Sequence, residues 1–162
     1  MRLTVEPART EELDLVLNLL EDASRWLLAK GVEQWHAGQW KREKIAAAME
    51  RGEVFLAWEG ATVVATISLQ WSDELLWPAA AGDAGYVHRL AVASDAHGRG
   101  LGRALLDWAG REIARRGRSP LRLDCACDNP GLRRYYEELG FRHRGDRPMG
   151  RYCASLYERA LQ

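Results

Sequence analysis

The chain has 162 residues, which suits one domain with a sizeable core and is short for two. Lys and Arg together number 23, as do Asp and Glu, so the formal net charge is zero. This balance provides no general field for nucleic acid or an anionic membrane. The sequence shows neither a signal-peptide stretch nor an apolar run of the roughly 18 residues that a membrane span needs. We therefore expect a single cytoplasmic domain over residues 1–162, without nucleic acid or membrane as partners.

The three cysteines are expected to be reduced thiols, as is usual in the cytoplasm. Cys125 and Cys127 are separated by one residue, which differs from the C-x-x-C spacing of metal and redox motifs. Cys153 provides no second ligand pair. The sequence therefore predicts no metal site.

Hydrophobic periodicity and turn residues predict the elements in chain order. The expected strands cover Leu3–Val5, 54–58, 62–69, 86–92 and 121–125, with two more at 141–144 and 152–157. The expected helices run from an N-cap at Thr10 to Gly31, then over 41–51, 100–116 and 129–139. The order β-α-α-β-β-β-α-β-α-β-β predicts the α/β (α+β) class, with a mixed, mostly antiparallel sheet of about seven strands and helices on both faces.

The expected strand over 86–92 carries polar and aromatic side chains in alternation. Strand geometry places Tyr86, His88, Leu90 and Val92 on one face, and Val87, Arg89 and Ala91 on the other.

A glycine-rich turn, His97-Gly98-Arg99-Gly100-Leu101-Gly102-Arg103, lies between this strand and the next helix. A helix N-terminus has backbone N–H groups without partners and carries partial positive charge. Glycines at 98, 100 and 102 leave space for phosphate oxygens to approach those groups. Arg99 and Arg103 could add charge-assisted bonds. The turn therefore predicts a diphosphate site, whereas a merely flexible turn would not explain three glycines at a helix start.

Two other phosphate motifs fit less well. No Lys-Ser or Lys-Thr pair follows the glycines, as a P-loop requires. A dinucleotide fingerprint should begin almost directly after its strand, but five residues intervene here. Asp124 superficially mimics the ribose-binding acid of that fold.

The stretch from Leu90-Ala91-Val92 through the glycine turn resembles the acetyl-CoA-binding motif Q/R-x-x-G-x-G/A of the GNAT superfamily of N-acetyltransferases. His97 stands where that motif has Gln or Arg. Asn129 and Tyr136, seven residues apart and followed by Gly140-Phe141, resemble the next GNAT motif. Leu132 replaces a commoner small residue there. The two motifs, in this order, cover about a third of the chain.

The resemblance implies roles for these residues. Main-chain groups at about Leu90 and Val92 would bind the pantetheine arm, and an N–H near Leu90 would stabilise the oxyanion. Asn129 would contact pantetheine, and Tyr136 would donate a proton to the leaving thiolate. The alternative for Tyr136 is a core aromatic beside Leu132 and Leu139.

The general base is open in the sequence. His88 titrates in the useful range, and the alternatives are Glu33, Asp73, Glu74 or an ordered water chain. Arg133 and Arg134 either meet the adenosine 3′-phosphate or are solvated.

The acceptor pocket is expected to be aromatic. The family implies a pocket near the loop over 31–40, which carries Trp35 and His36, and Trp71 and Trp77 precede the strand over 86–92. Trp35, with Tyr86 and His88, is expected to bind a small amine, aided by cation–π contact.

We therefore expect an N-acetyltransferase that moves an acetyl group from acetyl-CoA to a primary amine by direct attack in a ternary complex. Cys125 is a less favoured acyl-accepting nucleophile, because it lies in an expected central strand. The rival functions are a non-catalytic acyl-CoA sensor and, more weakly, a dinucleotide-binding module. The resemblance is also compatible with a homodimer.

Overall fold

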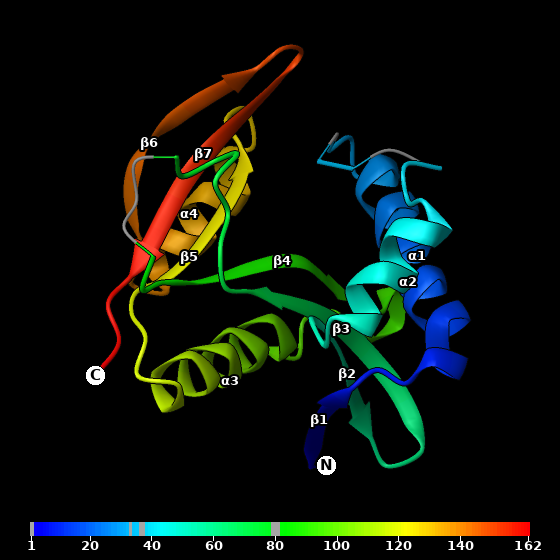
Figure 1. Cartoon of the computed structure of the whole chain (residues 1–162). Helices are drawn as coiled ribbons and strands as arrows, with labels where there is room; N and C mark the ends of the chain where they lie inside the picture. Colours follow the sequence, from blue (N-terminus) through cyan, green and yellow to red (C-terminus); the bar gives the residue numbers. More distant parts are fainter. Residues whose placement is uncertain (1, 33, 36–37, 79–81) are drawn as a thin grey trace. The chain divides into compact units, whose positions relative to one another are not determined.

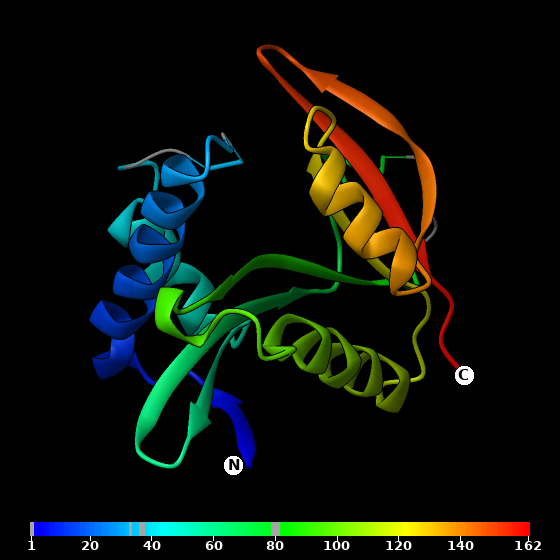
Figure 2. The ribbon, with the colours of Figure 1, turned by 180° about the vertical axis from the view of Figure 1, so that it is seen from behind.

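The computed structural model describes residues 2–32, 34–35, 38–78 and 82–162, and it contains a seven-stranded sheet of order β1-β2-β3-β4-β5-β7-β6 (Figure 1; Figure 2). The strands are β1 (Leu3–Pro7), β2 (Val54–Glu59), β3 (Thr62–Gln70), β4 (Gly85–Val92), β5 (Leu121–Ala126), β6 (Arg142–Met149) and β7 (Tyr152–Arg159). The helices are α1 (Leu13–Ala29), α2 (Arg42–Glu50), α3 (Leu101–Arg115) and α4 (Pro130–Glu138), with 3₁₀ turns η1 (Thr10–Glu12) and η2 (Ser94–Ala96).

The expected class and element order are confirmed. The sheet is mixed, because β4 and β5 pair in parallel whereas β5–β7 and β6–β7 pair antiparallel. The predicted N-cap at Thr10 is wrong. The chain enters α1 through η1, whose N-cap is Arg9, and the Glu12 carboxylate accepts the Arg9 N–H at 2.8 Å in a capping box. No helix in the described ranges is long and apolar enough to cross a membrane.

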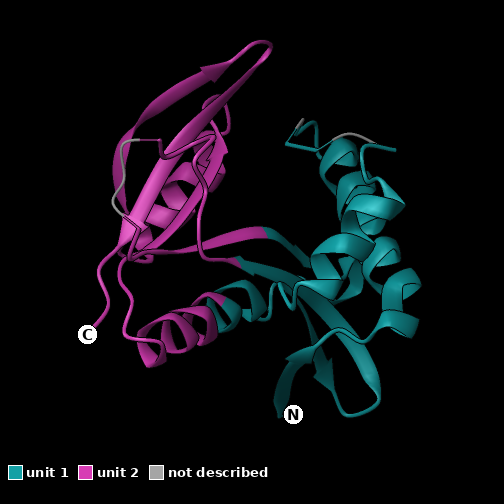
Figure 3. Cartoon of the chain, in the orientation of Figure 1, with its two compact units in different colours: residues 1–69, 89–105 teal, residues 70–88, 106–162 magenta. Residues whose placement is uncertain are grey.

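The chain divides into two compact units, residues 1–69 with 89–105 and residues 70–88 with 106–162, which we call unit 1 and unit 2 (Figure 3). In unit 1, β1 and β3 flank β2 in antiparallel register. Val16, Leu20 and Ala23 recur at helical spacing along α1 and are buried, together with Ile45 of α2 and Leu56 of β2. This apolar stripe is what holds α1 and α2 on the core of unit 1.

In unit 2, α4 covers one face of the strands β5, β7 and β6 (Figure 2). Its Tyr136 ring lies 5.7 Å from the Phe141 ring and 6.2 Å from the Tyr157 ring. The start of β4 packs closely on α3, since a Cβ on Gly85 would lie 2.4 Å from Ile113 Cγ1. Only glycine leaves room for that approach.

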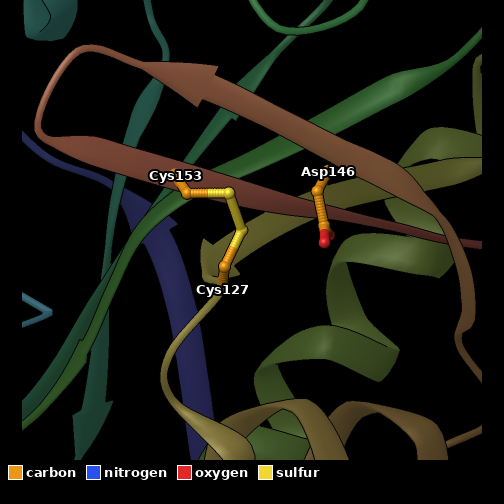
Figure 4. Close-up of side chains that lie close together, drawn as sticks. All are labelled: Cys127, Asp146 and Cys153. Carbon is orange, nitrogen blue, oxygen red and sulfur yellow. A yellow bond between two sulfur atoms is a disulfide. The ribbon is translucent and has the colours of Figure 1, made fainter.

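The expectation of three reduced thiols is wrong. Cys127 and Cys153 form a disulfide, with their Cα atoms 5.4 Å apart (Figure 4). The reason is strand pairing: Ala126, the last residue of β5, is the register partner of Ala154 in β7, so the next residues outward meet. Asp146 lies beside the two sulfur atoms, but they are bonded to each other, which removes them as thiolate ligands for a metal.

Candidate active site

The glycine turn of unit 1 joins η2 to α3, and two of its glycines have a left-handed backbone conformation. Gly98 and Gly100 have φ values of 79° and 75°, in the left-handed region where a Cβ is disfavoured. A Cβ built on either residue would meet nothing within 4 Å. The space beside the turn is therefore open, and α3 begins at Leu101, directly after it. Such a turn leaves the first N–H groups of a helix accessible to an anion.

Two side chains of the turn have partners in unit 1 that the sequence did not indicate. The His97 ring stacks on Trp26, with centroids 4.0 Å apart and planes 2° from parallel. Arg99 Nη2 donates to Glu59 Oε1 at 2.6 Å, and this hydrogen bond holds the Glu59 pKa below its usual value. His97 thus anchors the turn by stacking on α1, in place of the Gln or Arg that the motif has. Arg103 is exposed.

Strand β4 departs from regular strand geometry at Arg89, which has a φ of 52°. The expected uninterrupted alternation from Tyr86 to Val92 is therefore wrong, because a left-handed residue breaks the two-residue period. The parallel register with β5 includes Gly85↔Leu121 and Tyr86↔Arg122. Burial lowers the pKa of the Arg89 guanidinium, whose Nη1 has no hydrogen-bond partner among the described residues.

His88 and one of its predicted alternatives, Asp73, come together in unit 2. His88 Nε2 lies 3.0 Å from Asp73 Oδ2, and His88 Nδ1 lies 3.8 Å from Asp124 Oδ1. The Tyr152 hydroxyl donates to Asp124 Oδ2 at 3.3 Å. Burial raises the pKa of the Asp124 carboxyl, and Asp73 raises it further, whereas His88 lowers it. Glu74 is exposed, and Glu33, like His36, lies outside the described residues.

The Asn129…Tyr136 motif of unit 2 forms the start and the buried face of α4. Asn129 is the N-cap, and its Oδ1 accepts the Leu132 N–H at 3.1 Å. Its Nδ2 carries two further donors. Tyr136 is 8% exposed, and burial raises its pKa, as do Cys125 and Asp124. The phenol is therefore protonated at neutral pH, the form in which it donates a proton.

Two other residues of unit 2 that the sequence analysis named, Arg133 and Cys125, are held within the fold. Arg133 donates to the Tyr157 hydroxyl and to the Cys127 carbonyl, both at 3.2 Å, so its guanidinium ties α4 to the β5 end and to β7. Cys125 is fully buried, and burial raises its thiol pKa to about 12. A thiol that is protonated at neutral pH is a poor nucleophile.

The predicted pocket tryptophans belong to different units and have different neighbours. In unit 1, Trp35 packs on the core and meets the Trp40 ring edge-on at 5.0 Å. In unit 2, Trp71 lies under the guanidinium of Arg116, at 4.3 Å. Trp77 and Tyr86 are buried together, with ring centroids 6.4 Å apart.

Comparison with known proteins assigns the chain. The model of the acetyltransferase (GNAT) family matches residues 17–141. The uncharacterized N-acetyltransferase YesJ of Bacillus subtilis (strain 168) is 32% identical over 152 residues, which cover 86% of this chain and 81% of YesJ.

Solved structures share the fold. A GNAT-family acetyltransferase from Listeria monocytogenes is 27% identical, with a TM-score of 0.84 and coverage of 98% of this chain and 95% of that chain. The PaiA N-acetyltransferase of Thermoplasma acidophilum, in complex with coenzyme A, is 17% identical with a TM-score of 0.76 and covers 99% and 100% of the two chains. The matched family model and the relative at 32% identity leave one conclusion: the chain belongs to the GNAT family of acetyltransferases.

Proposed function

We propose that this chain transfers the acetyl group of acetyl-CoA to a primary amine. The observation that carries the proposal is the open glycine turn at the start of α3, in a chain that belongs to the GNAT family. The complex of PaiA with coenzyme A supports the choice of this co-substrate, since PaiA has the same fold. Acetyl-CoA supplies an activated acyl group on a thiol leaving group.

The backbone N–H groups of the turn and of the first turn of α3 bind the diphosphate. Gly98 and Gly100 keep the approach open, and the exposed Arg103 adds positive charge. Arg99 has a different part in this proposal. Its guanidinium is held by Glu59, so it shapes the turn.

Other groups bind the pantetheine arm and donate a proton at the reacting thioester. In unit 1, main-chain groups of Leu90, Ala91 and Val92, which follow Arg89 in β4, bind pantetheine. In unit 2, the Asn129 amide nitrogen is the proposed pantetheine donor. The amine nitrogen bonds to the acetyl carbon, and the carbon–sulfur bond breaks as the tetrahedral intermediate collapses. Tyr136 donates its phenolic proton to the departing sulfur.

His88 takes up the proton that the amine loses. Among the candidates for the general base, it is the described residue whose ring lies between two carboxylates, with Nε2 3.0 Å from Asp73 and Nδ1 3.8 Å from Asp124. The two carboxylates thus lie against opposite nitrogens of the imidazole. Trp35 and Tyr86 are the proposed aromatic contacts of the acceptor.

The test is the release of free thiol from acetyl-CoA across a library of amines. We expect Tyr136→Phe to keep its affinity for CoA and to lose about a hundredfold in turnover, since a positioned acid contributes roughly 10²–10⁴-fold. The neighbouring Tyr135→Phe is the matched control and should retain turnover. Tight acetyl-CoA binding without thiol release for any amine would instead indicate an acyl-CoA sensor.

A further inference from the structure

Two carboxylates share one imidazole in unit 2, in a cluster formed by Asp73, His88, Asp124 and Tyr152. The two carboxylates face opposite nitrogens of the His88 ring, at 3.0 Å and 3.8 Å. One imidazole therefore meets two acceptors, and even its cationic form neutralises only one of the two charges. The cluster carries at least one net negative charge whenever both carboxyls are ionised.

One basic side chain near the cluster, Arg122, is already engaged elsewhere. Arg122 lies two residues before Asp124 on β5, and its Nε donates to Glu158 at 3.1 Å. Its Nη1 donates to the Tyr86 hydroxyl, and its guanidinium lies 4.6 Å from the Trp77 ring centroid. Arg122 is therefore paired with Glu158, and does not serve as the counter-ion of Asp73 and Asp124.

The two oxygens of the Asp73 carboxylate have different surroundings. The side chain is 10% exposed, and its Oδ1 accepts the Leu76 N–H at 3.3 Å. Its Oδ2 is buried, lies 3.0 Å from His88 Nε2 and, in the part of the chain that the structure describes, receives no hydrogen bond. A buried carboxylate oxygen without a hydrogen-bond donor is costly, so a cationic donor bound beside His88 would stabilise it.

The surroundings of the cluster are aromatic and apolar. Trp77 and Tyr86 are buried, and Tyr152 and Leu76 pack against them. The Tyr152 hydroxyl also donates a hydrogen bond to Asp124. The main-chain N–H of Trp77 donates one to the main-chain carbonyl of Asp73. Carboxylates beside aromatic rings are the chemistry that recognises an alkylammonium group and rejects an anion.

We propose that Asp73 and Asp124 bind the acetyl acceptor as an organic cation, and that this acceptor is an amine with no carboxylate beside its reacting nitrogen. The inference rests on the proposed function, because it places the acceptor amine next to His88. It deepens that function by excluding free α-amino acids as good acceptors, since their carboxylate would be repelled by the cluster.

The experiment compares acceptors that differ only in that carboxylate: tyramine with tyrosine, tryptamine with tryptophan, and agmatine with arginine. Calorimetry in the presence of CoA gives binding, and thiol release from acetyl-CoA gives kcat/KM. We expect each decarboxylated amine to bind at least tenfold more tightly than its amino acid. Asp73→Asn and Asp124→Asn should both reduce this ratio severalfold.

Asp107→Asn is the matched control. It removes the same single charge from a carboxylate on α3 that pairs with Arg159, outside the cluster, and it should leave the ratio unchanged. Thermal unfolding of each variant establishes that it folds, and the two cluster variants provide independent tests. Equal binding of amines and amino acids, or equal effects of Asp73→Asn and Asp107→Asn, would overturn the inference. Selective amine binding without thiol release would support the cation site and count against the transferase.

Discussion

The substitution Gly100→Ala tests whether Gly100 is needed for acetyl-CoA binding or only for the stability of the fold. Gly100 has a φ of 75°, and its Cβ position is open to at least 4 Å. The substitution therefore causes no clash within the chain, and its cost to folding is backbone strain, about 1–2 kcal/mol. For a chain of this length each kcal/mol corresponds to roughly 2–4 °C, so the melting temperature should fall by about 2–8 °C.

The cost to acetyl-CoA binding is separate. A methyl group beside the turn would displace a phosphate oxygen from at least one backbone N–H, and a charge-assisted bond contributes about 1.5–3 kcal/mol. The dissociation constant of acetyl-CoA should therefore rise roughly tenfold to a hundredfold. Calorimetric titration measures this change, and differential scanning fluorimetry measures the change in stability.

Gly117→Ala is the control, because Gly117 has a φ of 71° and an equally open Cβ position but lies beyond the far end of α3. We expect the same loss of stability and no loss of affinity. If the two variants weakened acetyl-CoA binding equally, or if neither did, the assignment of the turn to the diphosphate would be refuted.

Three further predictions concern unit 2. Gly85→Ala should destabilise the fold by about 1–3 kcal/mol or more through overpacking on Ile113, and the added substitution Ile113→Ala should relieve that clash; a double variant whose stability is the sum of the two single losses would argue against the close approach. Alkylation of the denatured, unreduced protein followed by mass spectrometry should label one cysteine, Cys125, and Cys127→Ser should lower the unfolding free energy by about 3–4 kcal/mol; three labelled cysteines would contradict the disulfide. The raised pKa of Asp124 favours its protonated form in the folded state, so its contribution to stability is full below the unfolded carboxyl value near 4 and is lost as the pH rises through the folded value. Asp124→Asn should consequently flatten the dependence of unfolding free energy on pH above about 4, and a steeper dependence in urea titrations would contradict this sign.

Several features of this protein could be predicted from residue patterns, although His97 differs from the Gln or Arg of the family motif. The glycine turn was predicted because glycines leave space beside a helix start, and the Cβ positions of Gly98 and Gly100 are indeed open. Asn129 was predicted at the start of a helix, and its side chain does cap α4. Both features depend on local geometry, which the neighbouring residues dictate.

The partners of the site residues could not be predicted in the same way. Trp26 lies 71 positions before His97 and Glu59 lies 40 before Arg99, and their contacts depend on how α1, β2 and the turn pack within unit 1. Arg89 gave no signal for its left-handed φ, since arginine has no preference for that conformation. Long-range packing imposed it.

The sequence by itself determined the order of the elements, the phosphate-type turn and the family resemblance, because periodicity, caps and glycine positions are local properties. Only the tertiary structure decided that Cys127 bonds Cys153 across 26 residues and that Asp73 meets His88. The disulfide follows from strand pairing, because β7 lies beside β5 in a register that brings Cys127 and Cys153 together. Asp73 lies in the segment between β3 and β4, and the fold of unit 2 brings it to His88. Partners that are distant in sequence are set by how strands and loops pack together, and helix caps and glycine positions do not encode that packing.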